Sequence, residues 1–112
     1  MKLKNIINEL NIEVLSGQDQ LDGDVKGAYT SDLLSDVIAN SKADDLWITM
    51  QKHQNIIAVA KLKDLTGIIL VNDREPDQET IKKAKDESFP LLATKLSAFE
   101  ISGKLYTLLK RK

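Results

Sequence analysis

The chain of 112 residues contains no cysteine. This absence excludes disulfide bonds, thiolate catalysis and zinc sites with cysteine ligands. An excess of positive charge is also lacking, because 16 lysine and arginine residues face 17 aspartate and glutamate residues, for a net charge of −1. Proteins that bind nucleic acids hold the phosphates with a basic surface, so we expect no nucleic-acid partner.

Long apolar runs are missing as well. No stretch approaches the roughly 20 residues that a membrane-spanning helix needs. The first residues form an amphipathic pattern that includes Asn8 and Glu9, which is too polar for the core of a signal peptide. We therefore predict a soluble cytoplasmic protein with no membrane partner.

The residues that most enzymes use are scarce. His53 is the single histidine, so most pairings of a nucleophile with a base are absent. The carboxylates are scattered rather than clustered as metal ligands, and no glycine-rich motif that would cradle a phosphate occurs. We expect no enzyme activity, no catalytic residues, no metal site and no cofactor.

What the chain does contain is enough apolar sequence, 42% of residues, for the core of one domain. Apolar residues at helical spacing predict helices over residues 3–10, 33–40, 55–62, 77–87 and 98–109. Short runs rich in strand-forming residues predict strands over 12–15, 25–30, 46–49, 67–71 and 89–94.

From residue 25 onward strands and helices alternate, and this order predicts a mainly parallel sheet with helices packed against it. We therefore expect an α/β fold with a single three-layer domain over residues 1–112. In such folds ligands bind beside the carboxyl ends of the strands.

Four segments resemble a known family, at residues 27–34, 47–56, 68–72 and 89–94. Together they make the chain similar to the DRTGG domain family over nearly its whole length. The resemblance implies the fold of the N-terminal domains of HPr kinase/phosphorylase and of Mur ligases.

The two halves of the family's naming motif are different here. Lys52-His53 stands where the family has Asp-Arg, and Val71-Asn72-Asp73 stands where it has Thr-Gly-Gly. The Gln51-Lys52-His53-Gln54-Asn55 segment instead resembles a subgroup of small stand-alone members found near iron-only hydrogenase genes. The resemblance implies a regulatory role and this hydrogenase association.

Polar residues follow two of the predicted strands, and we interpret them as a ligand-binding site for a small anion or a nucleotide. A helix N-terminus favours an anion, and a histidine can add a donor that titrates near neutral pH. The predicted ligand-binding residues are Thr30, Ser31, Asp32, Thr49, Gln51, His53 and Asn55. The alternative is that Ser31, Asp32, Thr49 and Asn55 cap helices and that His53 is a solvated turn residue.

The last predicted helix carries a second apolar stripe with Phe99 and Tyr106 beside its core stripe, and this pattern predicts a homodimer. The first interpretation of function is therefore a non-catalytic regulatory or protein-interaction module that self-associates and is tuned by a small anionic ligand. The alternative is a sensor domain for a nucleotide or a phosphate ligand.

Overall fold

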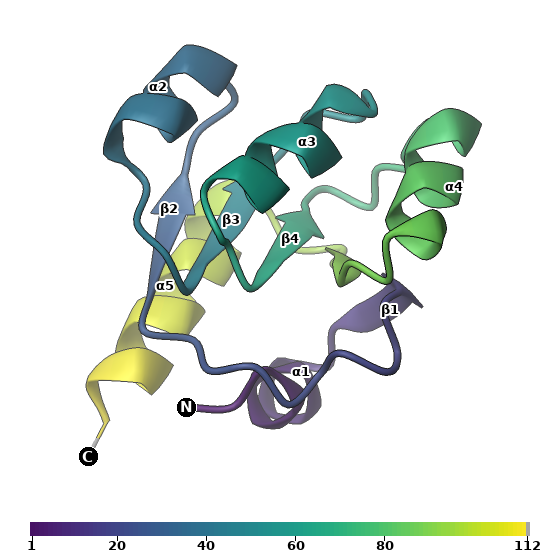
Figure 1. The fold of residues 1–112 in the computed structure, drawn as a ribbon. Helices are drawn as coiled ribbons and strands as arrows, with labels where there is room; N and C mark the ends of the chain where they lie inside the picture. The colour runs from purple at the N-terminus through teal and green to yellow at the C-terminus, as the bar shows by residue number, and fades with distance from the viewer. Residues whose placement is uncertain (112) are drawn as a thin grey trace.

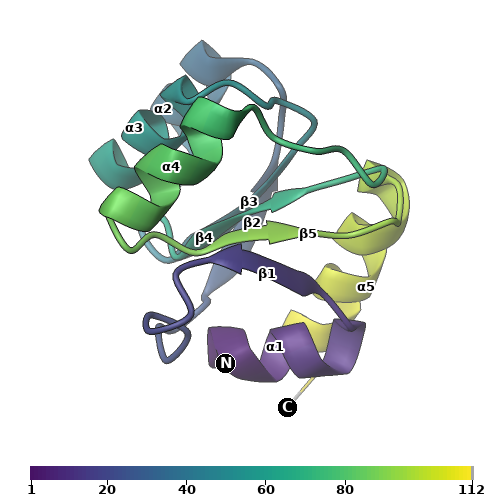
Figure 2. The same ribbon diagram turned by 90° about the vertical axis from the view of Figure 1, so that its right-hand side faces the viewer.

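The computed structural model describes residues 1–111 and contains a five-stranded sheet between two layers of helices (Figures 1 and 2). The strand order is β1-β5-β4-β3-β2. Strands β2 to β5 are parallel, and β1 pairs antiparallel with β5 at one edge. The strands are β1 (Glu13–Ser16), β2 (Gly27–Thr30), β3 (Asp45–Thr49), β4 (Gly67–Leu70) and β5 (Leu91–Ala93). The predicted α/β fold with a mainly parallel sheet is confirmed.

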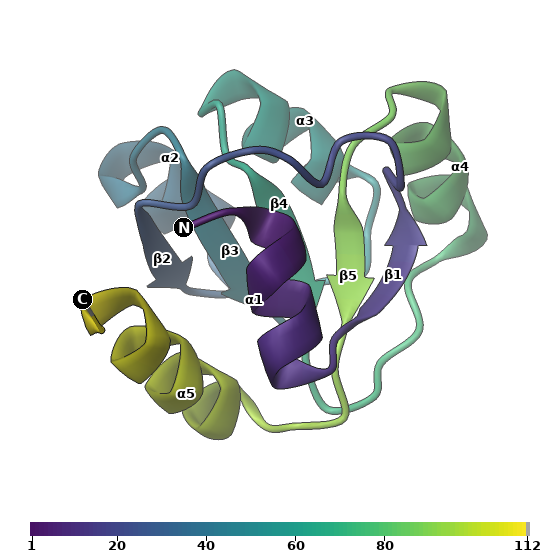
Figure 3. The ribbon, with the colours of Figure 1, turned by 90° about the horizontal axis from the view of Figure 1, so that it is seen from below.

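Helices cover both faces of this sheet. Helices α1 and α5 pack on one face, and α2, α3 and α4 pack on the other (Figures 2 and 3). The helices are α1 (Leu3–Leu10), α2 (Leu34–Asn40), α3 (Asn55–Leu62), α4 (Gln78–Asp86) and α5 (Ala98–Lys110). None of the helices in residues 1–111 has both the length and the apolar character to span a membrane.

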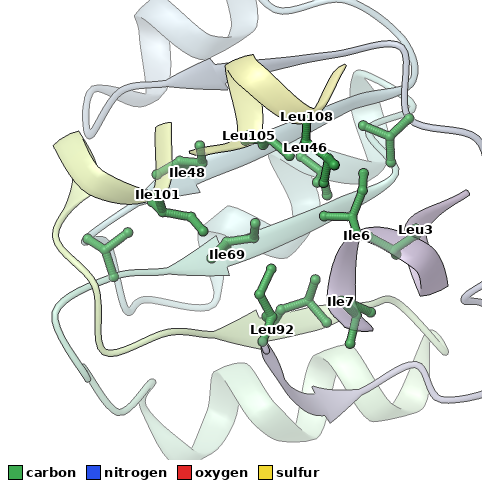
Figure 4. Close-up of a cluster of buried hydrophobic side chains, with 13 residues drawn as sticks. Leu3, Ile6, Ile7, Leu46, Ile48, Ile69, Leu92, Ile101, Leu105 and Leu108 are labelled. Atoms are coloured by element: carbon green, nitrogen blue, oxygen red, sulfur yellow. The ribbon is translucent and has the colours of Figure 1, made fainter. Parts of the chain in front are cut away.

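Each face of the sheet has its own apolar core. Successive strand residues point to opposite faces, so Trp47 packs under α2 and α3 while Ile48 packs under α5. Figure 4 shows the second core, in which side chains of α1 and α5 meet Leu46, Ile69 and Leu92 of three parallel strands. The central strands are buried on both faces, which explains why β4 and the middle of β3, residues 46–48, are apolar in the sequence.

The ends of several elements follow from single residues. Asn11 ends α1 in the left-handed conformation, with φ of 53°. Ser97 and Glu100 form the capping box that begins α5. Strand β5 begins only at Leu91, later than predicted, because Pro90 before it has no N–H group to donate to the sheet.

Strand β2 lies at the other edge of the sheet, where it has a neighbour on one side only. It is flanked by α2 on one face and by α5 on the other, and these three elements make up the left-hand side of the molecule in Figure 1. We call this side of the molecule, formed by β2 with the adjoining surfaces of α2 and α5, the β2 flank.

Candidate functional site

The connections that follow β2 and β3 meet at the carboxyl edge of the sheet. Asp32, after β2, accepts hydrogen bonds on Oδ1 from the Thr49 hydroxyl at 2.8 Å and from the Met50 amide at 2.7 Å. The parallel direction of the two strands produces this contact, because it brings the two strand ends to the same edge. Asp32 and Thr49 are thus close together, as the sequence predicted.

Gln51 completes this cross-link. Its side-chain amide donates to the Asp32 carbonyl at 2.8 Å, and its backbone amide donates to Thr49 Oγ1 at 3.1 Å. The Thr49 hydroxyl, with 1% of the residue exposed, therefore both donates and accepts within the protein. These bonds hold the two connections against each other. They also engage polar groups that would otherwise be available to bond a ligand at this edge.

His53 and Asn55 lie at the start of α3. The His53 Nδ1 accepts the Asn55 amide at 3.2 Å, and the His53 carbonyl accepts the Ile56 amide at 3.1 Å. The Ile57 amide donates to the Gln54 carbonyl, also at 3.1 Å. The first amides of α3 are thus bonded within the turn. With Nδ1 as acceptor, the proton of a neutral imidazole lies on Nε2, which leaves that atom as the possible donor to a ligand.

Ser31 and Thr30 have different surroundings from Asp32. Ser31 Oγ accepts the Leu33 amide at 3.2 Å, next to the start of α2, while the Ser31 carbonyl accepts the indole N–H of Trp47 at 2.8 Å. Thr30 points to the other face of the sheet, where its hydroxyl is 2.8 Å from that of Ser102 on α5. The seven predicted residues therefore form an Asp32–Thr49–Gln51 cross-link, a turn at His53, and two flanking hydroxyls.

None of the residues of the capping alternative provides a side-chain N-cap for α2 or α3, whose N-cap positions are Leu33 and Gln54. Ser31 and His53 bond backbone amides at the beginnings of α2 and α3. Asp32 does not cap α2, because its carboxylate is engaged by the connection after β3. A role in ligand binding for the seven residues stays a prediction.

One further polar pair lies beside this edge. The Tyr29 hydroxyl donates to Asp36 Oδ1 at 2.7 Å. This hydrogen bond raises the pKa of Tyr29, because the carboxylate stabilises the protonated phenol, and it lowers the pKa of Asp36. Among residues 1–111, no three histidine, aspartate or glutamate side chains are grouped so that they could hold a metal ion.

With this geometry in view, we compared the chain with known proteins. The profile of the DRTGG domain matches residues 5–108, which include the sheet and nearly all of the five helices. The chain belongs to the DRTGG domain family. A comparison with curated proteins gives no match.

The DRTGG fold is also found in a similar solved structure, the CBS and DRTGG domains of the regulatory region of Clostridium perfringens pyrophosphatase, complexed with the activator diadenosine tetraphosphate. The TM-score is 0.74 at 17% sequence identity, and the match covers 96% of this chain. This DRTGG domain spans 46% of the length of that regulatory region.

The backbone conformation at residues 72 and 73 bears on one half of the naming motif. Asn72 and Asp73, which the resemblance places where the motif has two glycines, both have left-handed backbone conformations, with φ of 60° and 57°. Asparagine and aspartate adopt this conformation more readily than other residues with a side chain. The two residues therefore allow a backbone that glycine would adopt without strain.

Sequence reasoning missed a hollow in the DRTGG domain at the β2 flank. It has a volume of about 370 Å³ and lies between β2 and α5. Of the predicted site residues it includes only Thr30, and the other polar lining residues are Lys26, Ser102, Tyr106 and Lys110. The Phe99 and Tyr106 stripe was the one signal for it, since the hollow exists only where α5 crosses the edge strand.

Proposed function

We propose that this DRTGG domain is a non-catalytic regulatory module that acts by self-association and is tuned by a small anionic ligand, with residues 1–112 working as one domain. The observation that carries this proposal is the β2 flank, where an unpaired strand edge lies between two exposed apolar surfaces. The match to a regulatory region supports the regulatory part of the proposal.

The edge of β2 has backbone groups available for a second copy. The Lys26 amide donates to the Asp44 carbonyl, toward β3. Because the backbone groups of a strand alternate in direction, those of Gly27 and Tyr29 face away from β3. An exposed edge of this kind pairs readily with another strand.

Two-fold symmetry then sets the register. An antiparallel pair of β2 strands centred on Tyr29 brings Gly27 of one copy opposite Ser31 of the other, twice in the dimer.

Exposed apolar side chains lie on both sides of this edge. Leu33 and Ile38, at α2, are 64% and 40% exposed, and Phe99 and Tyr106, on α5, are 88% and 66% exposed. Phe99, Ser102 and Tyr106 follow one another at helical spacing, so Phe99 lies on the side of α5 that faces β2. A second copy at the β2 edge would bury this apolar surface, which favours association.

Light scattering coupled to size exclusion tests the association. We expect a mass that rises from monomer to dimer with concentration, and Leu33→Asp should weaken the dimer at least about tenfold, because an aspartate would lose its hydration in the interface. Leu62→Asp is the matched control, since Leu62 is 68% exposed and lies on α3. A monomer at every concentration, or equal effects of both variants, would contradict self-association.

The alternative function is a sensor of a nucleotide or a phosphate ligand that binds at the carboxyl edge of the sheet. The ligand-binding residues would be Thr30, Ser31, Asp32, Thr49, Gln51, His53 and Asn55. The nucleotide bound to the similar regulatory region favours this alternative. Titration calorimetry with nucleotides and with phosphate tests it, and binding should weaken in His53→Ala. Binding at millimolar ligand that does not change in this variant would place the ligand elsewhere.

A further inference from the structure

The hollow at the β2 flank exists because a strand residue of small size faces α5. Ala28 presents only a methyl group to the helix, while the Thr30–Ser102 contact of 2.8 Å closes one end. The floor is apolar, with Ile48 fully buried and Leu109 partly buried. The volume of about 370 Å³ is within the usual range for small-molecule sites.

One end of the hollow is positively charged. Lys26 and Lys110 line it, and Arg111 and Lys26 line an adjoining hollow of about 520 Å³. Among the described residues, the three cations exceed the nearby negative charge. That charge comes from Asp44, 3.4 Å from Lys26, from Asp45, whose carboxylate lies next to Gly27, and from about half a unit at the C-terminal end of α5. In a chain of net charge −1, this local excess favours an anion.

The other groups suit an organic ligand. The ring of Tyr106 is largely exposed, and Lys110 Nζ lies over one of its faces, 5.5 Å from the centroid. A planar group would therefore stack on the opposite face of the ring. Thr30 and Ser102 share one hydrogen bond, which leaves one of the two hydroxyl protons free to donate. The helix dipole alone would account for cations at the C-terminal end of α5. It does not account for the Tyr106 ring or for the hydroxyls of Thr30 and Ser102 in the same hollow.

We propose that this hollow binds a nucleoside 5′-phosphate. The phosphate lies between Lys26 and Lys110, the base stacks on Tyr106 above the apolar floor, and Thr30 and Ser102 face the sugar. This site rests on the proposed function, because it supplies the anionic ligand that tunes the module. Its position at the β2 flank places the ligand beside the surface proposed for self-association.

Titration calorimetry with adenosine 5′-monophosphate, adenosine and inorganic phosphate tests this site on the full chain. We expect the monophosphate to bind more tightly than either of the others. Lys110→Gln, which removes one cation, and Ala28→Leu, which fills the hollow, should each weaken binding at least about tenfold. Lys104→Gln, with the same change on the same helix and away from the hollow, should not change binding. The circular dichroism spectrum confirms that each variant folds, and Lys110→Gln changes only an exposed side chain.

Each other outcome overturns the site. Unchanged binding in Lys110→Gln and Ala28→Leu, or an equal loss in Lys104→Gln, would show that the hollow is not where the ligand binds. Binding lost only in His53→Ala would move the site to the carboxyl edge. Phosphate that binds as tightly as the nucleotide would exclude a nucleoside ligand. Absence of binding by all three probes would overturn the site alone, since light scattering on the same samples reports separately on self-association.

Discussion

Asp32 connects two parts of the chain that are distant in sequence. Its carboxylate accepts hydrogen bonds from the Thr49 hydroxyl and the Met50 amide, while its carbonyl accepts one from the Gln51 side chain. The Thr49 hydroxyl is nearly inaccessible to water, so it depends on Asp32 as its acceptor. The stabilising role of Asp32 is separate from any role it has toward a ligand.

Replacing Asp32 with alanine should lower the free energy of unfolding by about 1–3 kcal/mol, because the Thr49 hydroxyl would keep its burial and lose its acceptor. Urea denaturation followed by Trp47 fluorescence measures this change. Asp19→Ala is the control, since Asp19 is exposed in a loop, and it should change stability by less than about 0.5 kcal/mol. Equal values for the two variants would mean that the cross-link adds nothing to stability.

The Tyr29–Asp36 bond should make stability depend on pH in acid. The pKa of Asp36 is lowered in the folded protein, so the unfolded chain binds more protons, and this contribution is lost as the pH falls below 3.8 through the folded value. In Tyr29→Phe the largest cause of the shift is gone, so we expect the pKa of Asp36 to rise toward its ordinary value. An NMR titration of the Asp36 carboxyl measures it, with Tyr106→Phe on α5 as the control. An identical Asp36 titration in Tyr29→Phe would contradict this assignment of cause.

At the scale of elements, the loops between helices and strands depend on backbone conformations that few residues adopt easily. Asn11, Asp44, Asp64 and Ser88 have positive φ just after α1 or in the connections that lead from α2, α3 and α4 into the next strand. Asparagine and aspartate are the side chains that tolerate this conformation best. The polar residues after these helices are therefore part of the turn geometry and need no functional explanation.

Two glycines should respond to alanine in opposite ways. A Cβ at Gly103, on the exposed side of α5, would have no atom of the described residues within 4 Å apart from its chain neighbours and its own helix backbone. Gly103→Ala should therefore stabilise the protein by about 1 kcal/mol through helix propensity. Gly17 has φ of +78°, and a Cβ there would lie 2.5 Å from the Pro90 nitrogen. Gly17→Ala should destabilise by more than about 1 kcal/mol. Thermal denaturation measures the change in stability of both variants relative to the original chain. A Gly17→Ala variant that is more stable would refute the steric argument.

At the scale of the whole molecule, the strand order determines which surfaces are available. The sheet ends at β1 on one side, with an antiparallel strand, and at β2 on the other. Because α5 returns across the sheet to β2, its exposed stripe lies next to the free edge. The proposed interface and the proposed ligand hollow thus share one flank through topology, although Lys26 and Lys110 lie near opposite ends of the chain.

The sequence by itself determined the kind and order of the elements, since helical spacing and strand alternation are local patterns that burial enforces. It also placed the connections after β2 and β3 at one edge, because alternating strands and helices favour a parallel sheet. Only the tertiary structure decided that Asp32 bonds Thr49 rather than capping α2. The Thr49 hydroxyl and the first amides of α2 are both suitable donors to a carboxylate, and the distance of each from Asp32 depends on how the elements pack. The free edge of β2 and the hollow under α5 likewise required the strand order and helix packing, which depend on contacts between residues far apart in the chain.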